Sequence, residues 1–200
     1  MMEYIISITL TSTIISMLIA ISAYKGYSLL KSPTLLRLFL AFSFISCGFL
    51  ILSFNIFINT LIISLIFHII GYFLLSFSYS IQSLQFKHMI PAIALISIAL
   101  SPLIIIPGDS LEHIIRSISF VLIVYGSTNA FVAYMMKKNV NTLMTSNGLA
   151  LLAFGEFIGW YGFIYPQSFF YELSLTIKML GLSVIMTPIY LKISGVRNGV

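Results

Sequence analysis

Two apolar runs separated by two residues set the fold of this chain: TSNGLALLAFGEFIGWYGFIY at residues 145–165 and SFFYELSLTIKMLGLSVIMTPIYLK at residues 168–192. Each run is long enough to cross the hydrocarbon core of a membrane as a helix, which takes about 20 predominantly apolar residues. A break this short makes the two helices antiparallel neighbours. The stretch therefore predicts a transmembrane helical hairpin.

The remainder of the chain has the same character. Apolar residues make up 60% and charged residues only 8% of the 200 residues, and the mean hydropathy is +1.09. A soluble domain has about 25% charged residues. The composition excludes a soluble domain and a disordered chain, and the single cysteine, Cys47, excludes a disulfide scaffold. The sequence therefore predicts an all-α, polytopic integral membrane protein in the lipid bilayer of the cell membrane.

Charges, prolines and polar clusters divide the chain into seven apolar segments. They cover approximately residues 4–24, 34–54, 56–80, 89–107, 111–136, 145–165 and 168–192. The connections between them are too short to fold outside the membrane. We therefore expect residues 1–200 to form a single transmembrane domain, a bundle of seven helices.

The basic residues test this count, because Lys and Arg accumulate in the cytoplasmic loops of membrane proteins. In a seven-span arrangement only Arg116 lies near one side, and the following residues fall on the other: Lys25, Lys31, Arg37, Lys87, Lys137, Lys138, Lys192 and Arg197. The acidic residues outside the spans accompany Arg116: Glu3, Asp109, Glu112 and Glu172. We therefore predict that the N-terminus lies outside and the C-terminus inside. The net charge of +5 belongs to these orienting loops, so we expect no nucleic-acid partner.

Weak self-similarity at a nearly constant offset indicates an internal repeat. Ala23-Tyr24 matches Ala133-Tyr134 at an offset of 110, and Leu40-Ala41 matches Leu149-Ala150 at an offset of 109. His68 and Gly71 match Lys178 and Gly181, again at an offset of 110. The pattern predicts a 3+1+3 plan, in which a fourth span joins two parallel units of three helices.

This architecture resembles that of several membrane proteins. Parallel repeats of three helices occur in the sugar transporters called SWEETs, and the count of seven resembles microbial rhodopsins and the membrane parts of archaeal sensor kinases. The end of the first span, Ala23-Tyr24-Lys25-Gly26-Tyr27, is similar to segments of such sensors. The resemblance is one of architecture and implies no particular substrate.

Three ionisable residues lie near the middle of predicted spans: His68, Glu156 and Lys178. An ionisable side chain inside a membrane is costly, and it indicates a role and a partner. At 1.5 Å per residue, Glu156 and Lys178 both lie about 14 Å below the same end of their hairpin, so they can pair. These three residues form the candidate intramembrane polar site.

Four glycines of the sixth span share one helix face: Gly148, Gly155, Gly159 and Gly162. Small residues at such spacings let two helix backbones approach closely in a membrane. We predict that this face packs against a neighbouring helix, and that the adjacent Glu156 points into the same interface.

Two interpretations of the polar site remain open. Glu156 and Lys178 could be a structural ion pair that locks two helices together, without chemistry. Alternatively, Glu156 could exchange protons, with Lys178 tuning it and with His68 as a second titrating group, since imidazole titrates near neutral pH.

The sequence carries no pattern typical of an enzyme. It lacks nucleophile–base sets, phosphate-binding glycine loops and metal-ligand spacings, so we expect no catalytic, cofactor-binding or metal-binding residues. The third span has no aspartate to serve a retinal Schiff base, and His68 has no histidine at its own depth with which to hold haem. No cofactor is therefore expected.

Two functions from different classes fit these features. The first is an accessory subunit or the membrane part of a sensor, which acts through helix contacts with a membrane-protein partner or with further copies of itself. The alternative is a small proton-linked transporter or channel that uses His68, Glu156 and Lys178. A transporter needs a water-reachable cavity at its centre, whereas an accessory subunit needs a filled centre and a contiguous helix face for its partner.

Overall fold

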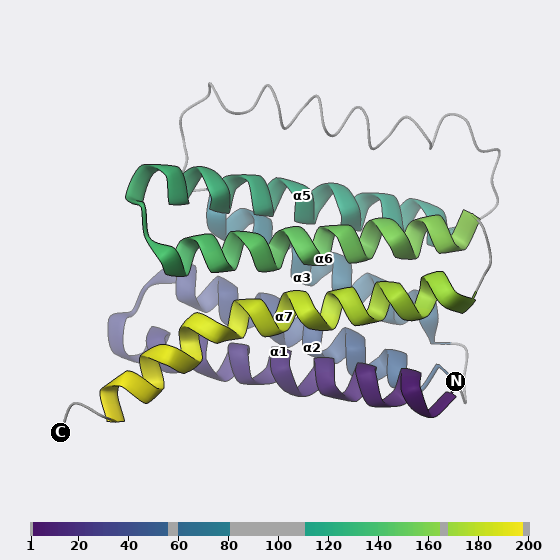
Figure 1. Ribbon diagram of the computed structural model, residues 1–200, viewed down its shortest axis with the longest axis horizontal. Coiled ribbons are helices and arrows are strands. Elements are labelled where there is room, and N and C mark those ends of the chain that lie inside the picture. The colour runs from purple at the N-terminus through teal and green to yellow at the C-terminus, as the bar shows by residue number, and fades with distance from the viewer. Residues whose placement is uncertain (1, 56–59, 81–110, 165–167, 198–200) are drawn as a thin grey trace.

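The computed structural model describes residues 2–55, 60–80, 111–164 and 168–197, and all regular structure in these ranges is α-helical (Figure 1). The helices are α1 (Met2–Leu30), α2 (Pro33–Ser53), α3 (Leu61–Ser80), α5 (Leu111–Lys137), α6 (Val140–Ile164) and α7 (Ser168–Arg197). Within these ranges, the stretches long and apolar enough to cross a membrane are Glu3–Leu30, Pro33–Ser53, Leu61–Tyr79, Glu112–Met136 and Phe169–Ile189. The prediction of a helical membrane bundle is thus confirmed. The predicted span at 89–107 lies outside the described residues.

Three helices extend by several residues beyond the predicted spans, because an apolar window measures the hydrocarbon thickness and not the end of a helix. α1 continues through Lys25 to Leu30, α6 begins at Val140 and not at residue 145, and α7 continues past residue 192 to Arg197. The helix ends are set by the backbone. Lys31 and Lys138 take left-handed φ angles of 50° and 51°, and their N–H groups donate to the carbonyls four residues earlier at 2.8 and 2.7 Å. This arrangement closes a helix at its C-terminus.

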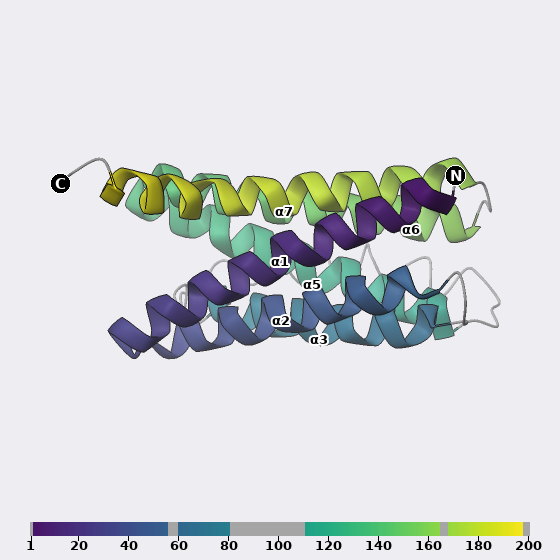
Figure 2. The same cartoon turned by 90° about the horizontal axis from the view of Figure 1, so that it is seen from below.

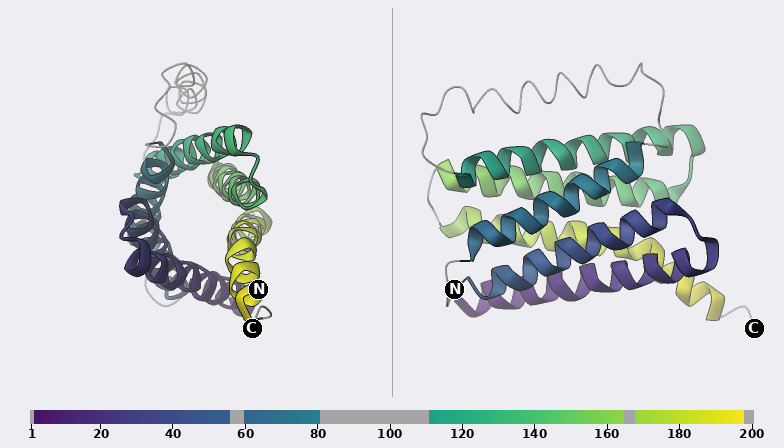
Figure 3. Two further views of the ribbon diagram at one scale, coloured as in Figure 1. Left: turned by 90° about the vertical axis from the view of Figure 1, so that its left-hand side faces the viewer. Right: turned by 180° about the vertical axis from the view of Figure 1, so that it is seen from behind.

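The described helices form a closed ring. α1 packs on α2, α2 on α3, α3 on α5, α5 on α6, α6 on α7, and α7 returns to α1. Figure 3 shows the ring viewed along the helices, and Figure 2 shows α1 crossing obliquely, beside α7 at its N-terminal end and beside α2 at its other end. A hydrogen bond of 3.2 Å between the hydroxyls of Tyr4 and Thr176 joins α1 to α7 at this closing interface.

The interior of the ring is divided along its length. We call the end at which α1, α3, α5 and α7 begin the N-end, and the opposite end the C-end. In the described residues, every buried Glu, Lys, Arg or His lies in the half toward the N-end: His68, His113, Arg116, Glu156 and Lys178. From the middle toward the C-end, apolar side chains fill the interior, among them Leu75, Ala130, Ile123, Leu149, Leu152 and Leu182, each 0% exposed. The buried polar side chains described in that half are uncharged.

Candidate functional site: a buried polar cluster

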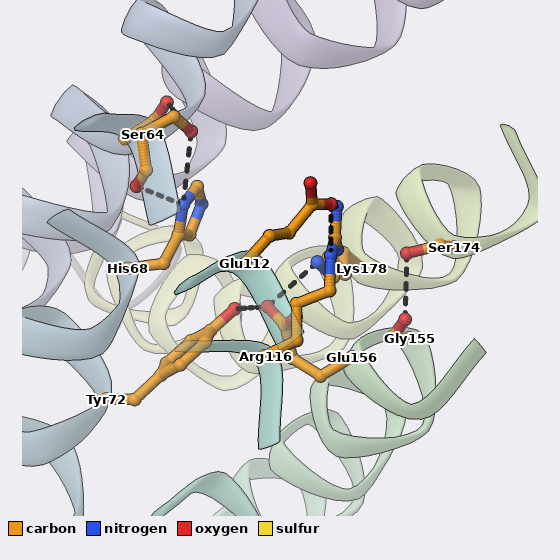
Figure 4. Close-up of polar contacts among 10 residues, drawn as sticks. Ser64, His68, Tyr72, Glu112, Arg116, Gly155, Glu156, Ser174 and Lys178 are labelled. Carbon is orange, nitrogen blue, oxygen red and sulfur yellow. Dashed lines mark hydrogen bonds and ion pairs between the residues drawn. The ribbon is translucent and has the colours of Figure 1, made fainter. Parts of the chain in front are cut away.

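Glu156 of α6 and Lys178 of α7 meet inside the ring (Figure 4). The Lys178 ammonium Nζ lies 2.8 Å from the Glu156 carboxylate Oε1, and the side chains are 6% and 0% exposed. The two helices run antiparallel, α6 ending at Ile164 and α7 beginning at Ser168, so residues at equal distances from these two ends lie at equal depth. Burial strengthens the attraction between the two charges, because little water screens them.

Tyr72 of α3 completes the contact from the opposite side of the ring interior. Its hydroxyl donates to Glu156 Oε1 at 2.8 Å, and its side chain is 0% exposed. Glu156 Oε1 therefore accepts hydrogen bonds from two different helices. Sequence reasoning missed Tyr72, although its position four residues after His68, next to Gly71, places it on the same helix face.

His68 lies beside this contact but does not bond to Glu156 or Lys178 in the structure. Its ring centroid is 5.9 Å from that of Tyr72 and 4.6 Å from that of Phe49, which it meets edge-on. Its Nδ1 lies 2.9 Å from the backbone carbonyl oxygen of Ser64. The ring packs over the bare backbone of Gly48, where a Cβ would come within 2.7 Å of it.

The four glycines of α6 all face α7. A Cβ on Gly148 would lie 2.7 Å from the carbonyl oxygen of Gly181, and one on Gly155 would lie 2.6 Å from Cγ of Lys178. A Cβ on Gly159 would lie 2.7 Å from Oγ of Ser174, and one on Gly162 would lie 2.8 Å from Cβ of Phe170. A Cβ less than 3 Å from these neighbouring atoms could be accommodated only if the two helices or the neighbouring side chains moved. These glycines therefore set the close approach of α6 and α7 that brings Lys178 to Glu156.

Arg116 extends the cluster toward the N-end. Arg116 forms an ion pair with Glu112, four residues earlier on α5: the side chains are 5% and 20% exposed, with Nη2 and Oε1 2.8 Å apart. The guanidinium lies over Gly159, where a Cβ would come within 3.0 Å of Nη1. At this level α5 lies close to α6, and this contact buries the Arg116 side chain. The position of Arg116 in the sequence, about one turn from the start of α5, does not show that burial.

Two polar atoms of the cluster are buried without a hydrogen-bond partner in the described part of the chain: Glu156 Oε2 and His68 Nε2. Buried polar atoms are nearly always paired, because an unpaired one loses its hydration without compensation. The cluster can thus hold a fixed ion pair and still offer two further positions for hydrogen bonding. The described residues contain no group of three His, Cys, Asp or Glu side chains placed to hold a metal ion.

Two polar features at the edge of the cluster join α5 to α6. The indole Nε1 of Trp160 donates to His113 Nδ1 at 2.8 Å, and Trp160 is only 4% exposed. Trp160 therefore packs inside the interface between α5 and α6. Ser127 and Ser146 donate to each other's backbone carbonyls at 3.2 Å, as hydroxyls at helix–helix contacts commonly do.

A groove of about 450 Å³ lies on the outside of the ring between α5 and α6. Its lining is mainly apolar and includes Phe120, Ala153, Phe154 and Phe157.

Comparison of the chain with family models, with curated proteins and with solved structures found no match. No function is therefore carried over to this chain from another protein.

Proposed function

We propose that this chain is a non-enzymatic seven-helix module of the cell membrane, which acts as an accessory subunit or as the membrane part of a sensor through helix contacts with a membrane-protein partner or further copies. The filled C-end half of the ring supports this proposal most directly. Leu75, Leu149 and Leu182 are all 0% exposed there, and an apolar barrier of this depth opposes the passage of ions and polar solutes. The described groove lies on the outer surface of the bundle and not at its centre.

A photocrosslinking scan in cells tests for the partner. A crosslinking amino acid replaces one exposed apolar residue on each described helix in turn: Ile14, Leu50, Ile63, Phe131, Phe154 and Leu180. We expect discrete protein adducts from adjacent helices of one face and none from the remaining helices, which serve as internal controls. Absence of adducts at all six positions would contradict a function exercised through partner contacts.

We further propose the 3+1+3 repeat, in which α1, α2 and α3 correspond to α5, α6 and α7. The order of packing around the ring supports it. When α1, α2 and α3 are matched with α5, α6 and α7, the interface between α3 and α5 corresponds to the interface between α7 and α1. Contacts at matching positions also support it. Ser64 donates to the carbonyl of Gly48, and Ser174 donates to that of Gly155, both at 2.8 Å.

These contacts favour an offset of 107 in the first two helices of each unit and of 110 in the third. Lys31 and Lys138, which end α1 and α5 in the left-handed conformation, are 107 residues apart. Each places its ammonium over the tyrosine four residues earlier, at 5.6 and 5.9 Å from the ring centroid. In this register Phe49 is the counterpart of Glu156, and His68 is that of Lys178. This register replaces the offset of 110 inferred from Ala23-Tyr24 and the offset of 109 inferred from Leu40-Ala41, and it keeps the offset of 110 inferred from His68 and Gly71.

The proposed orientation has the N-terminus outside and the C-terminus inside, and cysteine labelling tests it. Cys47 is first replaced, because it is an exposed free thiol. A cysteine at Ser110 should then react with a membrane-impermeant thiol reagent on intact cells, whereas one at Asn139, in the α5–α6 turn, should react only after the membrane is opened. The opposite pattern would reverse the orientation.

A proton-linked transporter remains the second candidate, and one observation favours it: Glu156 Oε2 and His68 Nε2 are buried without partners in the described part of the chain. In liposomes with an internal pH dye, the accessory or sensor function predicts no proton flux beyond that of empty liposomes. A flux that Glu156→Gln abolishes in a folded protein would favour the transporter. Lys25→Gln, far from the cluster, is the matched control.

A further inference from the structure

The hydrogen bond of His68 determines what its other nitrogen can do. The carbonyl oxygen of Ser64, 2.9 Å from Nδ1, can only accept a hydrogen bond, so Nδ1 carries the hydrogen. The nearby hydroxyl of Ser64 donates to the carbonyl of Gly48. In the neutral ring, Nε2 is then a hydrogen-bond acceptor. It is buried, since His68 is only 2% exposed.

Glu156 presents a second acceptor to the same cluster. Its Oε1 is occupied by Tyr72 and Lys178, both at 2.8 Å, whereas Oε2 has no partner in the described part of the chain. Tyr72 connects the two acceptors, because its ring lies beside His68 and its hydroxyl bonds to Glu156. Figure 4 shows the His68 ring above the contact between Tyr72 and Glu156, within one polar cluster.

The surrounding charges select the kind of molecule that these acceptors can bind. An anion would face two acceptors, one of them an oxygen of the negatively charged Glu156 carboxylate, which would repel it. A cation would lie beside Lys178, which already neutralises Glu156 at 2.8 Å, while Glu112 neutralises Arg116 at the same distance. Because each of the two ion pairs has no net charge, an uncharged molecule with O–H or N–H donors fits the cluster best.

We infer that the N-end half of the ring interior binds a small uncharged hydrogen-bond donor between His68 Nε2 and Glu156 Oε2. The donor reaches the cluster from the N-end, where the Glu112 side chain is 20% exposed and precedes the more buried Arg116. The apolar C-end half closes the site on its other side. This inference deepens the sensor form of the proposed function by naming the class of molecule that such a module would detect.

Nitrogen NMR of the full-length protein in detergent, labelled with ¹⁵N-histidine, tests the site. His68→Phe identifies the His68 signals. His113 serves as an internal reference, because its Nδ1 accepts a hydrogen bond from Trp160 at 2.8 Å. The protein is titrated with formamide and ethylene glycol, and in parallel with dimethylformamide and dimethoxyethane, which lack donor hydrogens.

Two results support the inference, and they distinguish a small solute from water as the bound donor. A saturable change in the Nε2 chemical shift with formamide or ethylene glycol, and not with the donor-free compounds, shows that the cluster binds a small solute. An Nε2 signal already typical of a hydrogen-bonded acceptor in buffer, exchanging with bulk deuterium and unchanged by the solutes, shows water.

Two other results overturn it. Nε2 that remains without a hydrogen bond throughout both titrations shows that the cluster binds no such donor. A ring protonated on both nitrogens shows that the proton is the ligand, which contradicts an uncharged one. Neither result affects the photocrosslinking scan, so failure of this inference and failure of the partner function are distinguishable.

Discussion

Replacing Lys178 with methionine is expected to lower the free energy of unfolding in detergent by about 3–5 kcal/mol, because the carboxylate of Glu156 would remain buried and lose its charged partner. Glu156→Gln is expected to cost a comparable amount, since it leaves Lys178 buried at 5% exposure without a counter-charge. Thermal unfolding of the purified protein, followed by circular dichroism, measures both losses.

The double variant Glu156→Gln with Lys178→Met should recover much of the loss, because neither charge is then left alone. Tyr72→Phe serves as the matched control: it removes one hydrogen bond to Glu156 but keeps the ion pair, so we expect a smaller loss of about 1.5–3 kcal/mol. Strict additivity of the two single losses would show that Glu156 and Lys178 do not interact.

The second large effect is expected from Gly148→Ala. An added Cβ would clash with Cγ1 of Ile185 and would lie 2.7 Å from the carbonyl oxygen of Gly181. The second contact is with backbone, which a rotamer change cannot relieve, so α6 and α7 must separate. Overpacking of this kind costs about 1–3 kcal/mol, and the separation should also weaken the contact between Glu156 and Lys178.

Gly26→Ala is the matched control for this substitution. Its Cβ would meet Cδ1 of Leu35 at 3.3 Å, a flexible side-chain end that can move away. We therefore expect Gly26→Ala to leave the unfolding temperature nearly unchanged, while Gly148→Ala lowers it. Equal unfolding temperatures for the two variants would contradict the role of Gly148 in the close approach of α6 and α7.

Much of the fold follows from the sequence because a membrane imposes few solutions. A run such as residues 34–54 must be helical to satisfy its backbone in lipid, and α2 covers Pro33–Ser53. Helix ends were predicted less well. The helix α1 passes Lys25 because a lysine side chain reaches back to the membrane surface, and it ends only where Lys31 turns left-handed before Pro33.

The candidate site was predictable where it depended on depth along a hairpin, and not where it depended on more distant helices. Glu156 and Lys178 belong to consecutive helices, so counting residues from the turn placed them at one level. Tyr72 is one of 11 tyrosines, and its role depends on α3 facing α6 across the ring. Burial of Arg116 depends on α6 presenting a bare glycine, Gly159, at the same height.

The closed ring has a consequence for the order in which the protein is made. Its closing interface, between α7 and α1, joins the first and the last of the described helices. During synthesis Glu156 enters the membrane 22 residues ahead of Lys178, so α6 would carry an unpaired acid until α7 follows. We therefore expect α6 and α7 to insert as one hairpin, and the hydrogen bond between Tyr4 of α1 and Thr176 of α7 to form only when α7 arrives and completes the ring.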